Sequence, residues 1–180
     1  MSELQVSAHA GDHTRGAEGA PATLVMYGDY ECPYTRQAYR IVQRLLAEEP
    51  DALRFVFRHF PLTSIHPHAQ HAAEAAEAAA AQGKFWEMHD TLFAHQHALD
   101  DADLRRYAED LTLDAERFVR EVSTQAHARR IADDARSGLA SGVQGTPTLY
   151  FNDHLHGGGY DEATLRATIA QIAGNAGHMP

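Results

Sequence analysis

The sequence contains a single cysteine among 180 residues, and this scarcity excludes an internal disulfide bond. Oxidation of Cys32 must therefore involve a second molecule. Long apolar runs are also missing, because no stretch approaches the ~18–20 residues that cross a bilayer, so we expect no membrane insertion. Basic residues are outnumbered 15 to 25 by acidic ones, and the formal net charge is -10. This balance argues against nucleic acid or an anionic membrane surface as the main partner.

The N-terminus lacks the basic start and apolar core of a secretory signal. We predict a polar, partly disordered arm over residues 1–20, with a short strand at 4–7, and one domain over residues 21–176. A single thiol without a signal peptide favours a reducing compartment, and we expect the cytoplasm. An exported protein that has lost its signal has the same appearance.

Apolar periodicity predicts an α/β fold. Short β-prone runs indicate strands at 22–29, 53–60 and 146–152, and a helix begins at Pro33, where the missing N–H costs nothing. The order strand, helix, strand favours a parallel pair with a right-handed crossover. A turn at the glycines 157–159 follows a possible hairpin partner at 154–156, and a helix capped by Asp161 closes the domain.

An all-helical insertion is predicted over about residues 62–140. It contains an alanine-rich helix from Pro67 to Gly83 and ends with one long helix that stops near Gly138. Within it, an aromatic and methionine group is most simply part of the core, the alternative being an apolar groove near the thiol. This group consists of Phe85, Trp86 and Met88.

Cys32 lies at the start of the first predicted helix, within "GDYECPYT". This is the frame of a C-x-x-C redox motif with Thr35 in the fourth position. A helix N-terminus stabilises a thiolate, whereas the nearby carboxylates of Asp29 and Glu31 oppose it. Thr35 lies one helical turn beyond Cys32, and we expect its hydroxyl to donate a hydrogen bond to the sulfur. The alternative is an inert buried thiol.

Pro147 marks a second unusual point, in "VQGTPTLYF". Proline is excluded from strand interiors, so Pro147 indicates a strand edge or an unusual peptide bond after Thr146. Considered alone, the residues favour the more frequent trans bond.

Thirteen histidines invite a search for a metal site. We assign none, because the candidates need not share a face and metal sites need convergent ligands. The histidines considered and given structural or exposed roles are His66, His68, His71, His89, His95 and His97. His59, at a strand end, is expected to be half-buried and to cap the strand. A Cys–His hydrolase is disfavoured, because no local signature of one accompanies Cys32.

Three separated segments resemble the DsbA-like thioredoxin family, especially the branch found as soluble proteins and as domains fused to NhaA-type sodium/proton antiporters. They are "YGDYECPYT", "RHFPLTSIHPHAQHAAEAAEAAAAQGKFWEMHDTLFAHQ" and "GVQGTPTLYFN". The resemblance implies a thioredoxin-like sheet with a helical insertion and no cofactor. It makes Cys32 the attacking cysteine and Pro33 and Tyr34 the intervening pair. It also makes Thr146–Pro147 a cis-proline loop that faces the thiol and pairs with a substrate peptide.

Thr35 replaces the second cysteine of the dithiol members of that family. The leading hypothesis is therefore a monothiol thiol–disulfide oxidoreductase in which Cys32 attacks a protein or peptide disulfide, or a glutathionylated substrate. Glutathione or a similar small thiol then releases the enzyme. Three alternatives remain: a redox-silent module that binds peptides or proteins, a peroxide sensor that passes through a sulfenic acid, and a glutathione-dependent isomerase.

Overall fold

A five-stranded mixed sheet lies at the centre of this computed structural model, which describes residues 3–177. The strand order is β1-β3-β2-β4-β5. The strands are β1 (His13–Gly16), β2 (Ala22–Gly28), β3 (Leu53–His59), β4 (Thr148–Phe151) and β5 (His154–Leu155). As predicted, β2 and β3 are parallel, whereas the other neighbouring pairs are antiparallel. The short hairpin partner after β4 is also confirmed.

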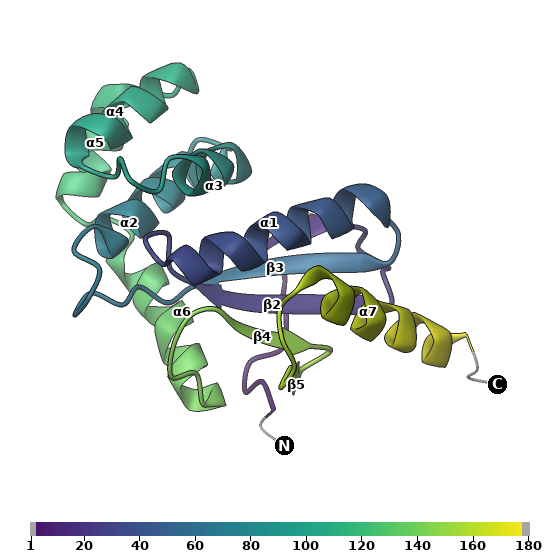
Figure 1. Ribbon diagram of the computed structural model, residues 1–180. Coiled ribbons are helices and arrows are strands. Elements are labelled where there is room, and N and C mark those ends of the chain that lie inside the picture. The colour runs from purple at the N-terminus through teal and green to yellow at the C-terminus, as the bar shows by residue number, and fades with distance from the viewer. Residues whose placement is uncertain (1–2, 178–180) are drawn as a thin grey trace.

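Each face of the sheet has its own core, because successive strand residues point to opposite sides. In β2, Leu24 and Met26 join the core beneath α1 (Pro33–Glu48) and α7 (Glu162–Ala176). Val25 and Tyr27 join a smaller core on the other face, against the C-terminal half of α6 (Ala128–Ser141). Figure 1 shows α1 and α7 lying along the sheet, with α6 running across one end of it.

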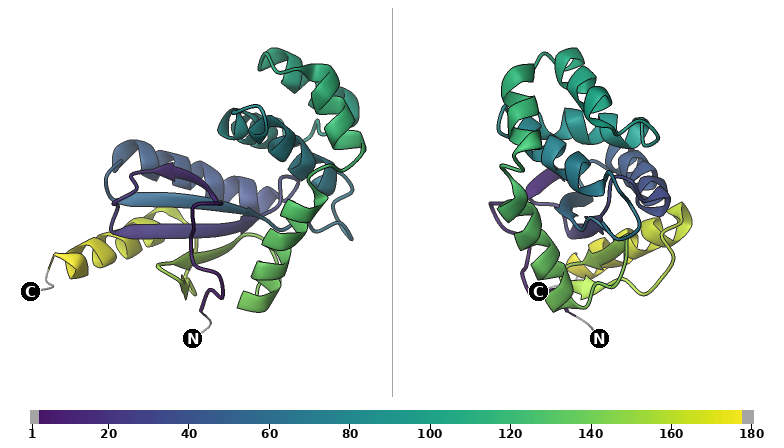
Figure 2. Two further views of the ribbon diagram at one scale, coloured as in Figure 1. Left: turned by 180° about the vertical axis from the view of Figure 1, so that it is seen from behind. Right: turned by 90° about the vertical axis from the view of Figure 1, so that its left-hand side faces the viewer.

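The helical insertion forms a separate block beyond the carboxyl end of β3 (Figures 1 and 2). It comprises α2 (Ala69–Ala80), α3 (Phe85–Ala94), α4 (Asp101–Asp110) and α5 (Ala115–Ser123), and α6 leads from it back to the sheet. The alanine-rich α2 is buried over most of its length and packs against α3 and α5. Phe85 and Met88 are core residues, and the partly buried Trp86 packs against them, as predicted.

Two expectations about the elements are wrong. The single helix expected to end near Gly138 is two helices, α5 and α6, separated by a turn in which Gln125 has a positive φ of 51°. The strand expected at 4–7 is absent, since this segment contributes only an isolated bridge between Glu3 and His154.

The N-terminal arm is also more ordered than its polar composition suggests. Residues 13–16 form the edge strand β1 on β3, and Leu4 is buried in the smaller core. Within residues 3–177, no helix is both long and apolar enough to cross a membrane.

Candidate active site

Cys32 occupies the N-cap position of α1, directly after the turn that follows β2. Its backbone is extended, with φ -75° and ψ 119°, and Pro33 begins the helix. The backbone N–H of Cys32 donates to Asp29 O at 3.1 Å, which closes the turn. The side chain is a free thiol with only 3% of the residue exposed. The strand, the turn and the proline thus fix the sulfur at the positive end of the helix dipole.

The loop before β4 faces this thiol. The Thr146–Pro147 peptide bond is cis, so the trans bond favoured by the residues considered alone is wrong. Pairing of Thr148 with Tyr27 places the loop beside the carboxyl end of β2, where the turn to Cys32 begins. The Cys32 thiol donates to Thr146 O at 3.4 Å. Residues that are more than 100 positions apart in the sequence therefore meet at one sulfur atom.

Thr35 is buried and has a different partner from the one predicted. Its Oγ1 accepts a hydrogen bond from Asp29 N–H at 3.4 Å, and its residue exposure is 0%. Among residues 3–177, the only hydrogen bond of the Cys32 sulfur is the one to Thr146, so the expected bond from Thr35 is not formed. In the resting structure the Thr35 hydroxyl helps to hold the turn.

The two carboxylates near Cys32, those of Asp29 and Glu31, accept hydrogen bonds from the loop between β3 and α2. The buried Asp29 carboxylate accepts from Glu31 N–H, Leu62 N–H and His66 Nδ1, each at 2.8 Å. Glu31 accepts from His68 N–H at 2.7 Å. Both carboxylates are therefore held by donors of the turn and of the loop between β3 and α2, and neither hydrogen-bonds to the thiol.

Two grooves begin at Pro33 and differ in charge. One, of about 470 Å³, is lined mainly by acidic, amide and histidine side chains. The other, of about 340 Å³, runs along α1 and is lined by arginines. Tyr34, 60% exposed, stands next to Pro33 at this end of the molecule. Of the residues expected to form the site, Cys32, Pro33 and Tyr34 thus lie in sequence at the start of α1. Thr146 and Pro147 lie in the loop whose carbonyl accepts from the thiol.

Among residues 3–177, no histidine bonds to the Cys32 sulfur, so none completes a Cys–His centre with it. His66 pairs with Asp29 and His71 with Asp101, so the H-x-H-x-x-H segment does not converge. His89 is fully buried against Tyr30, and burial lowers its pKa well below the usual value. His59 was expected to be half-buried, but only 1% of it is exposed, because its ring binds Glu77 on α2.

Comparison with known proteins agrees with this geometry. The family model described as thioredoxin matches residues 8–171, which is most of the chain. The chain belongs to the thioredoxin family. Within it, the arrangement of a helical insertion between β3 and β4 is the DsbA-like form predicted from the sequence.

Curated relatives of this thioredoxin-family chain are named Na⁺/H⁺ antiporters. One from Salinispora tropica is 49% identical over 169 residues, covering 94% of this chain and 26% of the relative. One from Salinispora arenicola is 51% identical over 158 residues, covering 88% of this chain and 24% of the relative. The chain therefore spans about a quarter of the length of these relatives.

Solved structures show the same fold. A thioredoxin-like oxidoreductase from Silicibacter pomeroyi has a TM-score of 0.80 at 27% identity, covering 92% of this chain and 94% of that one. BdbD from Bacillus subtilis has a TM-score of 0.79 at 23% identity, covering 90% of this chain and 92% of that one. Wolbachia pipientis alpha-DsbA1 has a TM-score of 0.82 at 19% identity, covering 98% of each chain. The fold is thus that of DsbA-like thiol–disulfide oxidoreductases.

Sequence reasoning missed one residue of this thioredoxin-family site. Gln96, between α3 and α4, is 6% exposed, and its Nε2 donates to Tyr30 O at 2.7 Å and to Cys32 O at 2.8 Å. The helical insertion is thereby tied to the backbone of the reactive turn. No periodicity or motif marks Gln96, because its role depends on contacts across more than 60 positions.

Proposed function

We propose that this protein is a monothiol thiol–disulfide oxidoreductase whose nucleophile is Cys32. The observation that carries the proposal is the thiol at the N-cap of α1, 3.4 Å from the carbonyl of the cis-proline loop, with threonine in place of a second cysteine. The helix N-terminus favours the thiolate, and the loop offers backbone groups to an extended substrate.

The first step is attack of the Cys32 thiolate on one sulfur of a protein or peptide disulfide, or on the glutathione sulfur of a glutathionylated protein. A bond forms between Cys32 Sγ and that sulfur, the original S–S bond breaks, and the second sulfur leaves as a thiolate that takes a proton from water. Thr146 O must give up its hydrogen bond to the thiol at this step.

The second step needs an external thiol, because Thr35 has no sulfur. The thiolate of glutathione or a similar small thiol attacks the mixed disulfide, forms a new disulfide with the departing group and restores the Cys32 thiolate. Both electrons come from the external thiol, so no bound cofactor is required. A cytoplasmic setting, where such thiols are abundant, suits this cycle.

The mixed disulfide provides the direct test. With glutathione disulfide and no reduced thiol, we expect the wild-type protein to accumulate one glutathione on Cys32, measured by intact-mass spectrometry. In Thr35→Cys the second thiol displaces the glutathione and leaves an internal disulfide, so the adduct does not accumulate. Thr35→Ser is the matched control and keeps the wild-type adduct. Wild-type protein that forms no adduct would contradict the proposal.

The arginine-lined groove favours an anionic thiol as the second substrate. It begins at Pro33, and the guanidinium groups of Arg36 and Arg40 form no hydrogen bond or ion pair with any residue from 3 to 177. Arg44, further along, is paired with Glu162. Two unpaired cations in a groove that begins at the residue after the nucleophile suit the carboxylates of a glutathione-like thiol, which is notable in a chain of net charge -10.

We therefore expect Arg36→Gln/Arg40→Gln to raise the KM for glutathione about tenfold and to change the rate with the uncharged 2-mercaptoethanol little. Steady-state reduction of a mixed disulfide with each thiol measures this difference. Arg120→Gln/Arg129→Gln, on α5 and α6 and outside this groove, serves as the control for loss of two positive charges. Equal losses with both thiols would exclude a charge-selective groove.

A redox-silent binding module is the second candidate, and the low exposure of Cys32 favours it. Only 3% of the residue is accessible, while the neighbouring Tyr34 is 60% exposed and Ile65 67%. Such a module would bind peptide segments through this surface and the Thr146–Pro147 loop without sulfur chemistry. Replacement of Cys32 distinguishes the two candidates.

A further inference from the structure

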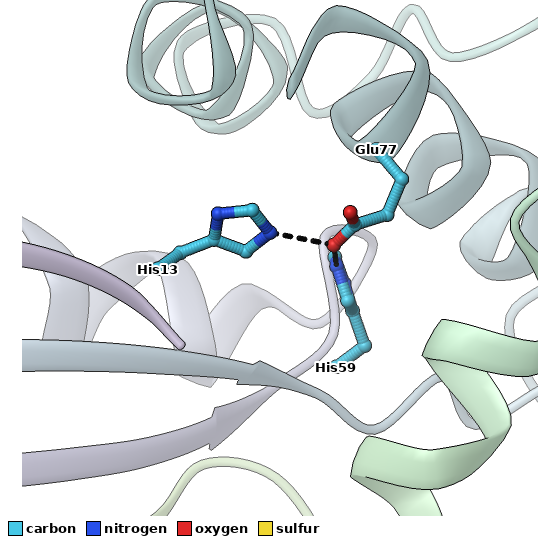
Figure 3. Close-up of side chains that lie close together, drawn as sticks. All are labelled: His13, His59 and Glu77. Atoms are coloured by element: carbon cyan, nitrogen blue, oxygen red, sulfur yellow. Dashed lines mark hydrogen bonds and ion pairs between the residues drawn. The ribbon is translucent and has the colours of Figure 1, made fainter. Parts of the chain in front are cut away.

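Three side chains that are far apart in the sequence converge at a second place in the molecule. His13 on β1, His59 at the end of β3 and Glu77 on α2 point toward one another (Figure 3). The Nε2 atoms of both histidines lie 2.7 Å from the same atom, Glu77 Oε1. Within residues 3–177, no other group of three or more histidine, cysteine, aspartate or glutamate side chains has ligand atoms that all lie within 4.8 Å of one another.

We propose that these side chains bind a divalent transition-metal ion, for which Zn²⁺ is the best match. Imidazole nitrogen and carboxylate oxygen are donors that Zn²⁺ accepts, and two histidines with one glutamate leave the fourth tetrahedral position to water. A site made mainly of nitrogen donors also disfavours Mg²⁺ and Ca²⁺, which prefer oxygen.

Small movements convert the hydrogen-bonded group into a metal site. At metal–ligand distances of about 2.0–2.2 Å, tetrahedral ligands lie about 3.4 Å apart, so each Nε2 must move about 0.7 Å from Oε1. When Nε2 gives its lone pair to the metal, the ring proton shifts to Nδ1, the tautomer in which a neutral imidazole binds metals. His59 Nδ1 has no partner among the described residues, so this shift breaks no existing hydrogen bond of that atom.

The charge of the group also suits a cation. Glu77 supplies a carboxylate that is only 7% exposed, and one of its oxygens lies against both histidine rings. The His13 side chain is 18% exposed and borders an open groove of about 600 Å³, which provides an entry path.

Arg130 opposes the metal and gives the proposal an internal test. Its Nε lies 4.0 Å from Glu77 Oε1, so a bound cation would meet a like charge at short range. Its Nη1 donates to Gly11 O at the surface. Removing the guanidinium charge should strengthen metal binding, whereas removing a ligand should weaken it.

The experiment titrates Zn²⁺ into the full chain carrying Cys32→Ser, which removes the only thiol that could compete for metal. Calorimetry should show one strong site. On this background His13→Gln should bind at least about 100-fold more weakly, because loss of a ligand exceeds the cost of losing an outer-shell partner. Arg130→Gln should bind more tightly, and His71→Gln, an α2 histidine outside the group, should bind as the parent does.

Spectroscopy with Co²⁺ tests the site in the protein that keeps all three proposed ligands. Co²⁺ in place of Zn²⁺ should shift the NMR signals of the His13 and His59 rings more than those of the other histidines, and should give the intense visible absorption of a tetrahedral site. Circular dichroism checks that His13→Gln is folded. Absence of a strong site in the parent, equal affinity in His13→Gln, or large shifts at other histidines would overturn the proposal.

Discussion

The Cys32→Ser protein is expected to fold normally and to lose thiol–disulfide exchange by at least about 10³-fold. No other residue can form the mixed disulfide, because the chain contains no second sulfhydryl. Serine fills nearly the same volume, and its hydroxyl can donate to Thr146 O as the thiol does. The free energy of unfolding should therefore change by only about 1 kcal/mol.

The same variant decides between the two candidate functions. Exchange is measured with a glutathionylated peptide and reduced glutathione, and binding with the same peptide by fluorescence anisotropy. The oxidoreductase hypothesis predicts that exchange is lost in Cys32→Ser and that binding persists. If the wild-type protein shows no exchange but both proteins bind the peptide equally, the protein is a binding module. Tyr34→Ala, which removes an exposed side chain at the site, should weaken binding in either case.

Local signals explain why the frame of this site was predictable. The apolar run of β2, the proline at the start of α1 and the unusual Thr-Pro before β4 each depend on only a few consecutive residues. The predicted cap of α7 depends on equally local spacing, because the Asp161 side chain accepts from the backbone N–H of Thr164, three residues later. Such contacts follow from spacing alone, so sequence reasoning finds them.

Long-range pairing explains what was missed. β1 has the sequence His-Thr-Arg-Gly and carries no apolar pattern, yet it pairs along β3 and places His13 beside Glu77. Gln96 likewise serves backbone carbonyls of a distant turn. The partner of a polar side chain depends on topology, and a single sequence leaves that topology open until the strands are placed.

Arg58 is the clearest buried example, and it explains why the polar N-terminal arm is ordered. Its side chain and that of Asp12 are each 1% exposed. The guanidinium donates twice to Asp12, at 2.9 Å each, and once to Tyr27 OH at 3.0 Å. It also donates to the carbonyls of Val6 and Ser7. All five guanidinium donors are thus satisfied, and four of them by the arm.

We expect Asp12→Asn to lower the free energy of unfolding by about 3 kcal/mol or more, because it leaves the Arg58 charge buried without a counterion. Urea denaturation measures the change. Arg105→Ala, which removes exposed ion pairs with Glu109 and Glu116, should have little effect. In a double-mutant cycle, adding Arg58→Met to Asp12→Asn should cost less than Arg58→Met costs alone. Additive losses would show that the two side chains act independently.

The loss of stability in Asp12→Asn should also depend on pH in a defined direction. Burial alone would raise the pKa of Asp12, but the hydrogen bonds and charge of Arg58 outweigh it and hold the pKa below its usual value. Since the folded pKa lies below the unfolded one, the ion pair contributes its full stability above about pH 5, where Asp12 is ionised in both states, and loses it as acid protonates the carboxyl group. The stability difference between wild-type protein and Asp12→Asn should therefore be constant from pH 5 to 7 and shrink below about pH 4. A difference that stays constant down to pH 2 would mean that packing of the arm, rather than the charge of Asp12, stabilises this part of the fold.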